Sequence, residues 1–262
     1  MMMAECGCAP HAVDDYILPV TENIKLADRI FWMTFAAPEL ARRAKAGNGV
    51  MVYASQGSDP MLGRPFAVAD AESGKISICY MIIGRGTELL SKVQPGASLR
   101  VRGLIGAAYP DSAKKLLLAA GGVGVGAVML KKKERAKSAS LYVGMPGRGC
   151  EALADKILSI HPDAKIYTDD GSFGEGNSMF NVLPRPLGEG RQLWCCGPPG
   201  FLDAMRLYYE RTPRQLYYII DKRMACGFGG CMGCVVETAN GPKRVCVDGA
   251  MFRADEVDLH DD

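Results

Sequence analysis

A cysteine run near the end of the sequence constrains this chain more than any other feature. Cys226, Cys231 and Cys234 are spaced as C-x4-C-x2-C, and Cys246 follows further along. This is the plant-type spacing for a [2Fe–2S] cluster, in which three thiolates come from one loop and a fourth is remote. The glycines between the cysteines permit positive φ and a close approach of the backbone to the sulfides. We therefore expect Cys226, Cys231, Cys234 and Cys246 to be metal ligands.

Two alternatives exist for these cysteines. A structural zinc site is the first, but zinc sites more often use two C-x2-C pairs. Disulfides are the second, and they belong to oxidising compartments. The start MMMAECGCAP has no basic region followed by an apolar run, so we expect no secretion signal and a cytoplasmic protein. We expect most of the other cysteines to be small buried hydrophobes; they are Cys6, Cys8, Cys79, Cys150, Cys195 and Cys196.

Charge and hydropathy give no indication of a nucleic-acid or membrane partner. The 262 residues include 31 Lys and Arg against 29 Asp and Glu, a net charge of +2 that gives no reason to expect nucleic acid or an acidic membrane. The longest apolar stretch, Leu116 to Leu130, is interrupted by glycines and is too short to span a bilayer comfortably.

The pattern of apolar runs divides the chain into three parts, at residues 1–110, 111–215 and 216–262. Short runs such as 12–20, 24–35, 49–54, 66–69, 75–83 and 98–102 predict a small antiparallel barrel with one helix near 87–93. After residue 114, short buried strands alternate with helical stretches at 149–160 and 200–211, which predicts a parallel α/β domain. The cysteine run forms the third part.

Two weak motifs in the first part gain meaning from their order. Arg64-Pro65-Phe66-Ala67 begins a strand, and Gly86-Thr87 begins a helix after Tyr80-Met81. An arginine on a barrel strand can hold a pyrophosphate with a two-pronged hydrogen bond, and a helix start offers free N–H groups to the same phosphates. We expect both motifs to serve one dinucleotide.

The second part contains a loose dinucleotide fingerprint. Gly121-Gly122-Val123-Gly124-Val125 follows the buried strand Leu117 to Ala120, as a phosphate-binding turn does. Cys196-Gly197-Pro198 and Asp169-Asp170 stand at the ends of later strands, where ligands of parallel sheets bind. Simple turn chemistry is the alternative for the two aspartates.

Taken in order, these motifs resemble the ferredoxin–NADP⁺ reductase superfamily, and within it most closely the electron-transfer subunit of class B dihydroorotate dehydrogenase. The resemblance runs from about Asp14 to Leu259 and is most specific at Arg223-Met-Ala-Cys226 and its following cysteines. Other matching segments are Arg64-Pro-Phe-Ala, Gly84-Arg-Gly-Thr87, Ala120-Gly-Gly-Val-Gly, Thr168-Asp-Asp-Gly-Ser, Cys196-Gly-Pro and Cys246-x-Asp-Gly-x-x-Phe252. The chain departs from the family where Ala67 replaces a serine, where Gly103-Leu-Ile-Gly106 lacks a proline, and at Asp221-Lys222.

The resemblance implies a relay of redox centres: NADH gives hydride to FAD, and a [2Fe–2S] cluster exchanges the electrons with an FMN-containing dihydroorotate dehydrogenase catalytic subunit in a hetero-oligomer. It implies a catalytic role for Cys196. It also implies that FAD and NAD(H) contact Arg64, Pro65, Phe66, Ala67, Tyr80, Met81, Gly86, Thr87, Gly121, Gly122, Gly124, Val125, Asp169, Asp170, Gly197 and Pro198. Two other hypotheses stay open, a related subunit serving another redox partner and a zinc-bearing redox-sensing module.

Overall fold

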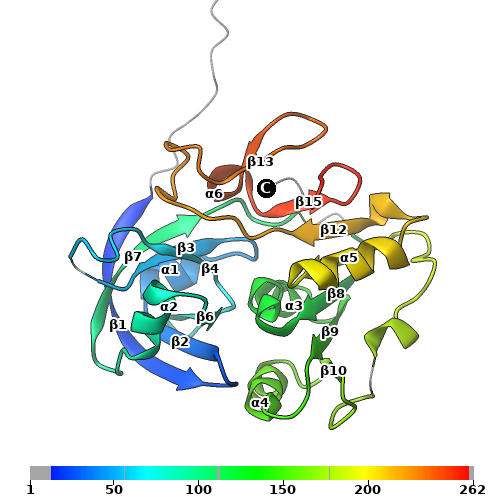
Figure 1. Cartoon of the computed structure of the whole chain (residues 1–262), viewed down its shortest axis with the longest axis horizontal. Helices are drawn as coiled ribbons and strands as arrows, with labels where there is room; N and C mark the ends of the chain where they lie inside the picture. The colour runs from blue at the N-terminus through cyan, green and yellow to red at the C-terminus, as the bar shows by residue number, and fades with distance from the viewer. Residues whose placement is uncertain (1–12, 56, 111–112, 177, 260–262) are drawn as a thin grey trace, which may run out of the picture.

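The computed structural model describes residues 13–55, 57–110, 113–176 and 178–259 of the chain. These residues form a seven-stranded sheet, a six-stranded sheet and a two-stranded ribbon (Figure 1). Cys6 and Cys8 lie outside them. Within the described ranges, no helix combines the length and apolar character needed to cross a bilayer.

The first sheet confirms the expected antiparallel barrel. Its order is β4-β3-β7-β1-β2-β6-β5, and all its pairings are antiparallel. Trp32, Phe35 and Ile76 are among the side chains buried inside it. The strands are β1 (Asp14–Lys25), β2 (Ile30–Ala36), β3 (Gly49–Tyr53), β4 (Arg64–Ala67), β5 (Asp70–Glu72), β6 (Lys75–Met81) and β7 (Ser98–Ile105), with helices α1 (Pro38–Arg43) and α2 (Arg85–Ser91).

The predicted strand over 24–35 is wrong, because a hairpin turn divides it. The N–H groups of Leu26 and Ala27 both donate to the carbonyl of Ile30, at 2.8 and 3.2 Å, and this closes the turn between β1 and β2. The turn contains neither glycine nor proline, so the sequence has no strong turn signal at this point. The sequence pattern does not predict helix α1 or strand β5 either, because both are very short.

The second sheet confirms the expected parallel α/β arrangement and extends it. Its order is β10-β9-β8-β11-β12-β15, and only β15 runs antiparallel to its neighbour. Strand β8 is buried from Leu116 to Gly121, which explains its continuous apolar run. The strands are β8 (Lys115–Gly121), β9 (Ala139–Met145), β10 (Lys165–Thr168), β11 (Arg191–Cys196), β12 (Leu216–Ile219) and β15 (Met251–Arg253). The helices are η1 (Gly122–Ala127), α3 (Met129–Glu134), α4 (Glu151–Ile160), η2 (Met179–Asn181), α5 (Pro199–Tyr208) and η3 (Pro213–Gln215).

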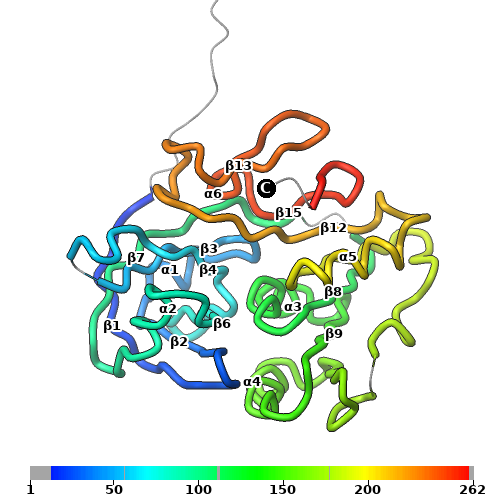
Figure 2. The backbone as a smooth tube through the Cα atoms, viewed as in Figure 1, coloured from blue at the N-terminus to red at the C-terminus, as the bar shows by residue number. Residues whose placement is uncertain are grey.

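The cysteine segment, residues 221–250, lies between β12 and β15 in the chain and against the barrel in space (Figure 2). It contains β13 (Val235–Val236), β14 (Lys243–Arg244) and α6 (Val245–Asp248). The N–H of Gly106, just after β7, donates to the carbonyl of Cys246 at 2.9 Å. Both flanking strands belong to the second sheet, and the bond to Gly106 joins the segment to the barrel, so the segment contacts both sheets. The domain division at 215/216 stays a prediction.

Helix α3 joins the barrel to the second sheet through charged side chains. Lys133 contacts Asp70 at 2.7 Å and Glu72 at 2.9 Å, both on β5. Glu134 accepts the N–H of Ala46 at 2.7 Å. Because η1 directly precedes α3, these contacts hold the glycine turn against the barrel.

Candidate functional site

The first part of the site brings two predicted residues into direct contact. Arg64 begins β4, and Gly86 lies in the first turn of α2. A Cβ added at Gly86 would lie 2.2 Å from Nε of Arg64, so the guanidinium rests on the glycine. The same guanidinium donates to the carbonyl of Leu62. The motifs that the sequence places about twenty residues apart therefore meet at one point, where a fork of N–H groups is available for an anion.

Thr87 stabilises the turn that precedes α2. Its hydroxyl accepts the N–H groups of Ile83 at 2.9 Å and Gly84 at 3.2 Å, and donates to the Gly84 carbonyl at 2.9 Å. The side chain is buried, with 3% exposed. The hydroxyl is thus used within the turn, and the residue acts on this site by shaping the backbone.

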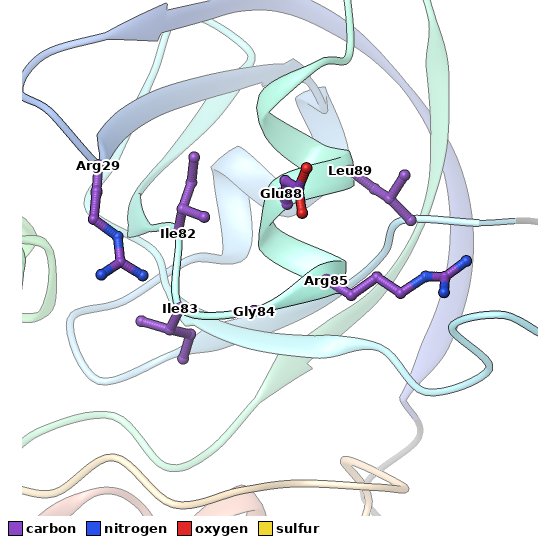
Figure 3. Close-up of a pocket in the computed structure, with 7 residues that line it drawn as sticks. All are labelled: Arg29, Ile82, Ile83, Gly84, Arg85, Glu88 and Leu89. Carbon is purple, nitrogen blue, oxygen red and sulfur yellow. The ribbon is translucent and has the colours of Figure 1, made fainter.

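An open cavity of about 630 Å³ lies beside this turn (Figure 3). Arg29 and Arg85 line it from two sides; the Arg29 guanidinium lies near Ile83, whereas the Arg85 side chain extends away from Arg29. The other lining residues are Ile82, Ile83, Gly84, Glu88 and Leu89. Arg85 also pairs with Asp59 at 2.7 Å. The volume lies within the range of ligand sites, and the Arg29 guanidinium suits a phosphate-bearing ligand. Sequence reasoning missed Arg29, which is distant along the chain and joins the site through the bond from Ile82 N–H to the Arg29 carbonyl at 2.8 Å.

The residues predicted on β4 and β6 divide into buried and accessible ones. Tyr80 is 1% exposed, stacks with Phe31 at 5.6 Å between ring centroids, and donates its hydroxyl to Asn23. Its ring also lies 5.6 Å from Phe66. Met81 is exposed, while Pro65, Phe66 and Ala67 are partly buried. The Tyr80 side chain therefore belongs to the barrel core, and Met81 lies at the accessible end of the strand.

The second part of the site is the junction of the glycine turn with the end of β11. A Cβ at Gly124 would lie 2.5 Å from the carbonyl oxygen of Cys196 and 2.9 Å from the nitrogen of Gly197. A Cβ at Gly121 would lie 3.0 Å from Pro198. Residues Ala120 and Cys196 are partners in adjacent parallel strands. The tertiary structure thus brings together the two predicted motifs at the carboxyl ends of neighbouring strands, where ligands of such sheets bind.

The glycine turn also contacts the barrel. A Cβ at Gly126 would lie 3.0 Å from Cβ of Cys79 on β6. Val125 is fully buried, so its side chain belongs to the core. Gly122 has φ +51 and no described atom within 4 Å of an added Cβ, so it faces open space. The turn therefore stands between the barrel and the second sheet.

Cys196 has the chemistry of a neutral thiol. Burial, and then the negative charge of Asp221, raises the pKa of Cys196 to about 12. The thiol stays protonated near neutral pH, so it can contact a ligand but is a poor nucleophile. Asp221 is one of the positions where the sequence departs from the family pattern. Desolvation raises the pKa of its carboxyl, although the residue keeps contact with solvent.

Asp170 holds two loops together. Its carboxylate accepts the N–H of Ser172 at 2.9 Å and that of Arg148 at 3.2 Å, which ties the loop after β10 to the loop after β9. The hydrogen bond from Ser172 is the main reason that the pKa of Asp170 is lowered. Asp169 beside it is exposed. Turn chemistry accounts for the contacts of Asp170, and a ligand contact by either aspartate stays a prediction.

The four predicted metal ligands lie in two pairs. Cys226 Sγ accepts the N–H of Cys231 at 3.4 Å, and these two residues are the more accessible pair. Cys234 and Cys246 are buried, and their thiols are hydrogen-bonded to each other. Among the described residues, no three or more Cys, His, Asp or Glu side chains converge as a site for one metal ion.

The donor set fits a two-iron cluster better than a single ion. Each iron of a [2Fe–2S] cluster takes two protein thiolates, whereas zinc draws four ligands into one tetrahedron. Burial opposes ionisation of Cys226, but the backbone N–H groups of Phe228 and Cys231, among others, lower its pKa to about 6. Gly227 and Gly229 have φ +76 and +86, and added Cβ atoms would lie within 3 Å of Met51 and Val247. N–H groups directed at sulfur and a backbone free of side chains suit a cluster whose potential depends on such hydrogen bonds.

Comparisons with known proteins extend these observations. Residues 221–258 match the family described as the iron–sulfur cluster binding domain of dihydroorotate dehydrogenase B. The chain is 32% identical over 246 residues to the dihydroorotate dehydrogenase B (NAD(+)) electron transfer subunit homolog of Aquifex aeolicus, covering 92% of this chain and 97% of the relative. It is 32% identical over 256 residues to the electron transfer subunit of Geobacillus kaustophilus, covering 92% and 98%.

Solved structures show the same fold at lower identity. The structure of an NADH-dependent reduced ferredoxin-NADP oxidoreductase matches with a TM-score of 0.80 at 22% identity, covering 93% of this chain and 90% of that one. Phthalate dioxygenase reductase matches with a TM-score of 0.64 at 18% identity, covering 90% and 95%. At these identities the likenesses show the fold alone.

Proposed function

The chain belongs to the family of dihydroorotate dehydrogenase B electron-transfer subunits, and from this membership we propose that it carries electrons between NAD(H) and a catalytic partner subunit through FAD and a [2Fe–2S] cluster. The partner would hold FMN and interconvert dihydroorotate and orotate, so this chain would bind neither compound. We place the protein in the cytoplasm, in a hetero-oligomer with that partner.

The main support for this proposal is the position of the barrel between the glycine turn and the cysteine segment. One side of the barrel contacts the glycine turn, where Gly126 lies against Cys79. Another contacts the cysteine segment, where Gly106 N–H bonds to the Cys246 carbonyl. A flavin held at the barrel would therefore lie between a nicotinamide at the glycine turn and a cluster at the cysteines.

The chain's own residues would bind and orient the groups of this relay. Arg64 would give charge-assisted hydrogen bonds to the FAD pyrophosphate, with Gly86 leaving room for its guanidinium. The glycine turn would hold the NAD(H) phosphates, and Cys196 would present a neutral thiol beside the nicotinamide. When bound, FAD accepts a hydride and releases electrons singly, which a one-electron cluster requires. We assign residues 1–110 to FAD, 111–215 to NAD(H) and 216–262 to the cluster.

Substitution of one accessible ligand tests the proposal. Cys231→Ser should abolish the cluster, because an oxygen ligand suits iron–sulfur chemistry poorly, while the flavin contacts lie elsewhere. The variant should keep NADH-dependent reduction of an artificial acceptor that draws electrons from FAD, and lose reduction of the FMN partner. Iron, sulfide and FAD content and complex formation are measured in the same preparation.

Met232→Ala is the matched control, since it changes the neighbouring exposed side chain and removes no thiolate. It should keep the cluster and the partner reaction. If a flavin-replete, partner-bound, cluster-free Cys231→Ser protein reduced the partner at the wild-type rate, the relay would be wrong. Stoichiometric zinc without iron in the wild-type protein would equally overturn it.

A further inference from the structure

One side chain links the barrel directly to the backbone of a proposed cluster ligand. Arg102 lies on β7, and its Nη1 donates to the carbonyl oxygen of Cys226 at 2.9 Å. On its other edge, Nε and Nη2 donate to the two carboxylate oxygens of Asp15 at 2.7 and 2.9 Å. Only 21% of the Arg102 side chain is exposed. The guanidinium is therefore fixed on both edges and largely shielded from water.

The surrounding packing keeps the cysteine segment on this part of the barrel. The Phe228 ring lies 5.6 Å from the Arg102 guanidinium carbon. A Cβ at Gly227 would lie 2.5 Å from Sδ of Met51, which is the strand partner of Arg102 on β3. The residue after Cys226 thus rests on the barrel surface, and Arg102 holds the carbonyl just before it.

The Arg102–Asp15 ion pair is oriented with its positive side toward Cys226. Asp15 occupies the edge of the guanidinium away from Cys226, so the positive end of the pair faces the cysteine. One-electron reduction of a bound cluster would make the cluster with its thiolates one charge unit more negative. A fixed positive charge nearby favours that state, and shielding from water strengthens the effect.

We propose that Arg102 is a positioning residue that holds the Cys226 loop on the barrel and raises the reduction potential of the cluster. This inference rests on the proposed function, since it requires a cluster at the four cysteines. It concerns how readily the cluster takes an electron from the flavin side.

Arg100 supplies the matched control. It lies two residues earlier on the same face of β7, and its guanidinium carbon lies 3.7 Å from the centre of the Tyr53 ring. In the described part of the chain, it has no hydrogen bond to the cysteine segment. Arg100 and Arg102 are alike in charge and strand face, but only Arg102 donates to the Cys226 carbonyl and pairs with both carboxylate oxygens of Asp15.

The experiment measures the midpoint potential of the cluster in the intact, FAD-loaded chain by an EPR-monitored redox titration. Arg102→Met should lower the potential by about 59 mV, equivalent to a tenfold shift in a one-electron equilibrium. Arg102→Lys should keep most of the wild-type value, and Arg100→Met should shift it by less than a third as much. The flavin potential should stay the same in all variants.

Asp15→Asn gives a prediction of opposite sign that does not depend on removing Arg102. Loss of the carboxylate leaves the guanidinium less compensated, so the potential should rise. Equal shifts in Arg102→Met and Arg100→Met, no shift in Arg102→Met, or a fall in Asp15→Asn would overturn the inference. If Arg102→Met fails to assemble a cluster, the other two variants decide: a potential near the wild-type value in Arg102→Lys and a rise in Asp15→Asn support the inference, and any other pair of results overturns it. A wild-type chain without a cluster signal would instead refute the proposed function itself.

Discussion

The cysteine segment and the glycine turn after β8 are both glycine-rich loops, but they differ in the size of the hydrophobic core that supports them. The small core at the cysteine segment consists of Cys234, Val236, Val245 and Cys246 of the segment, with Phe252 of β15. Two of these five are proposed ligands, and the segment's strands have two residues each. The glycine turn instead follows a buried strand in a six-stranded sheet.

This difference predicts different dependence on the bound group. A small core cannot by itself offset the entropy of ordering its chain, so such modules are commonly stabilised by their metal. A turn backed by a large sheet is held in shape before its ligand arrives. We expect the cysteine segment to lose structure without its cluster and the glycine turn to keep its structure without NAD(H).

The largest expected effect is that of removing a buried ligand. Cys246→Ala should eliminate the cluster and release residues 221–250 to rapid hydrogen exchange, while the amides of β8 and β11 stay protected. Mass spectrometry of exchanged peptides, with iron analysis, measures both effects.

Val236→Ala is the control, because it weakens the same small core without removing a thiolate. It should cost about 1–2 kcal/mol of local stability and keep the iron. Protection of residues 221–250 in an iron-free Cys246→Ala protein would show that the segment folds without its cluster, contrary to the comparison.

A smaller effect is expected at the glycine turn. In Gly124→Ala the new methyl meets backbone atoms of Cys196 and Gly197, which cannot move as a side-chain end can. We expect at least a tenfold loss in the rate of flavin reduction by NADH and a stability cost of about 1–3 kcal/mol. FAD and iron content should stay unchanged. Stopped-flow kinetics and thermal unfolding provide the measurements.

Gly200→Ala near the same turn provides the comparison, since no described atom lies within 4 Å of its added Cβ. It should preserve the rate and cost no stability, because alanine favours the helix more than glycine does. An unchanged rate in Gly124→Ala would contradict the placement of the nicotinamide at this junction.

The smallest effect is expected at Gly86. An alanine there meets the flexible end of Arg64, which can swing away at little cost to the fold. Displacing it should weaken one charge-assisted contact to the FAD pyrophosphate. We expect FAD affinity to fall about tenfold, toward the value for Arg64→Ala, with stability nearly unchanged.

Equilibrium dialysis of FAD from both variants checks this prediction, with Gly200→Ala again as the control, since no described atom lies within 4 Å of its added Cβ and it lies outside this site. Equal FAD retention in Gly86→Ala, Arg64→Ala and wild-type protein would contradict the assignment of this contact to FAD.

The sequence by itself determined the features that depend on local spacing and composition. The C-x4-C-x2-C run specifies how far apart the thiolates are along one loop, and continuous apolar runs specify buried parallel strands. The cysteine spacing and the apolar runs can each be recognised from a short stretch of sequence. The two-sheet fold follows from these patterns, and the structure confirms it.

Only the tertiary structure decided which distant residues meet. The bond from Arg102 to Cys226 joins residues 124 positions apart, and Lys133 joins Asp70 across 63. Arg29 reaches the cavity beside α2 only because β2 pairs with β6. Arg100 and Arg102 cannot be told apart by sequence pattern. Arg102 holds a proposed ligand because the cysteine segment returns to the barrel beside Arg102, whereas Arg100 lies over the Tyr53 ring. Such contacts depend on chain reversals and packing between sheets, which leave no periodic signal in the sequence.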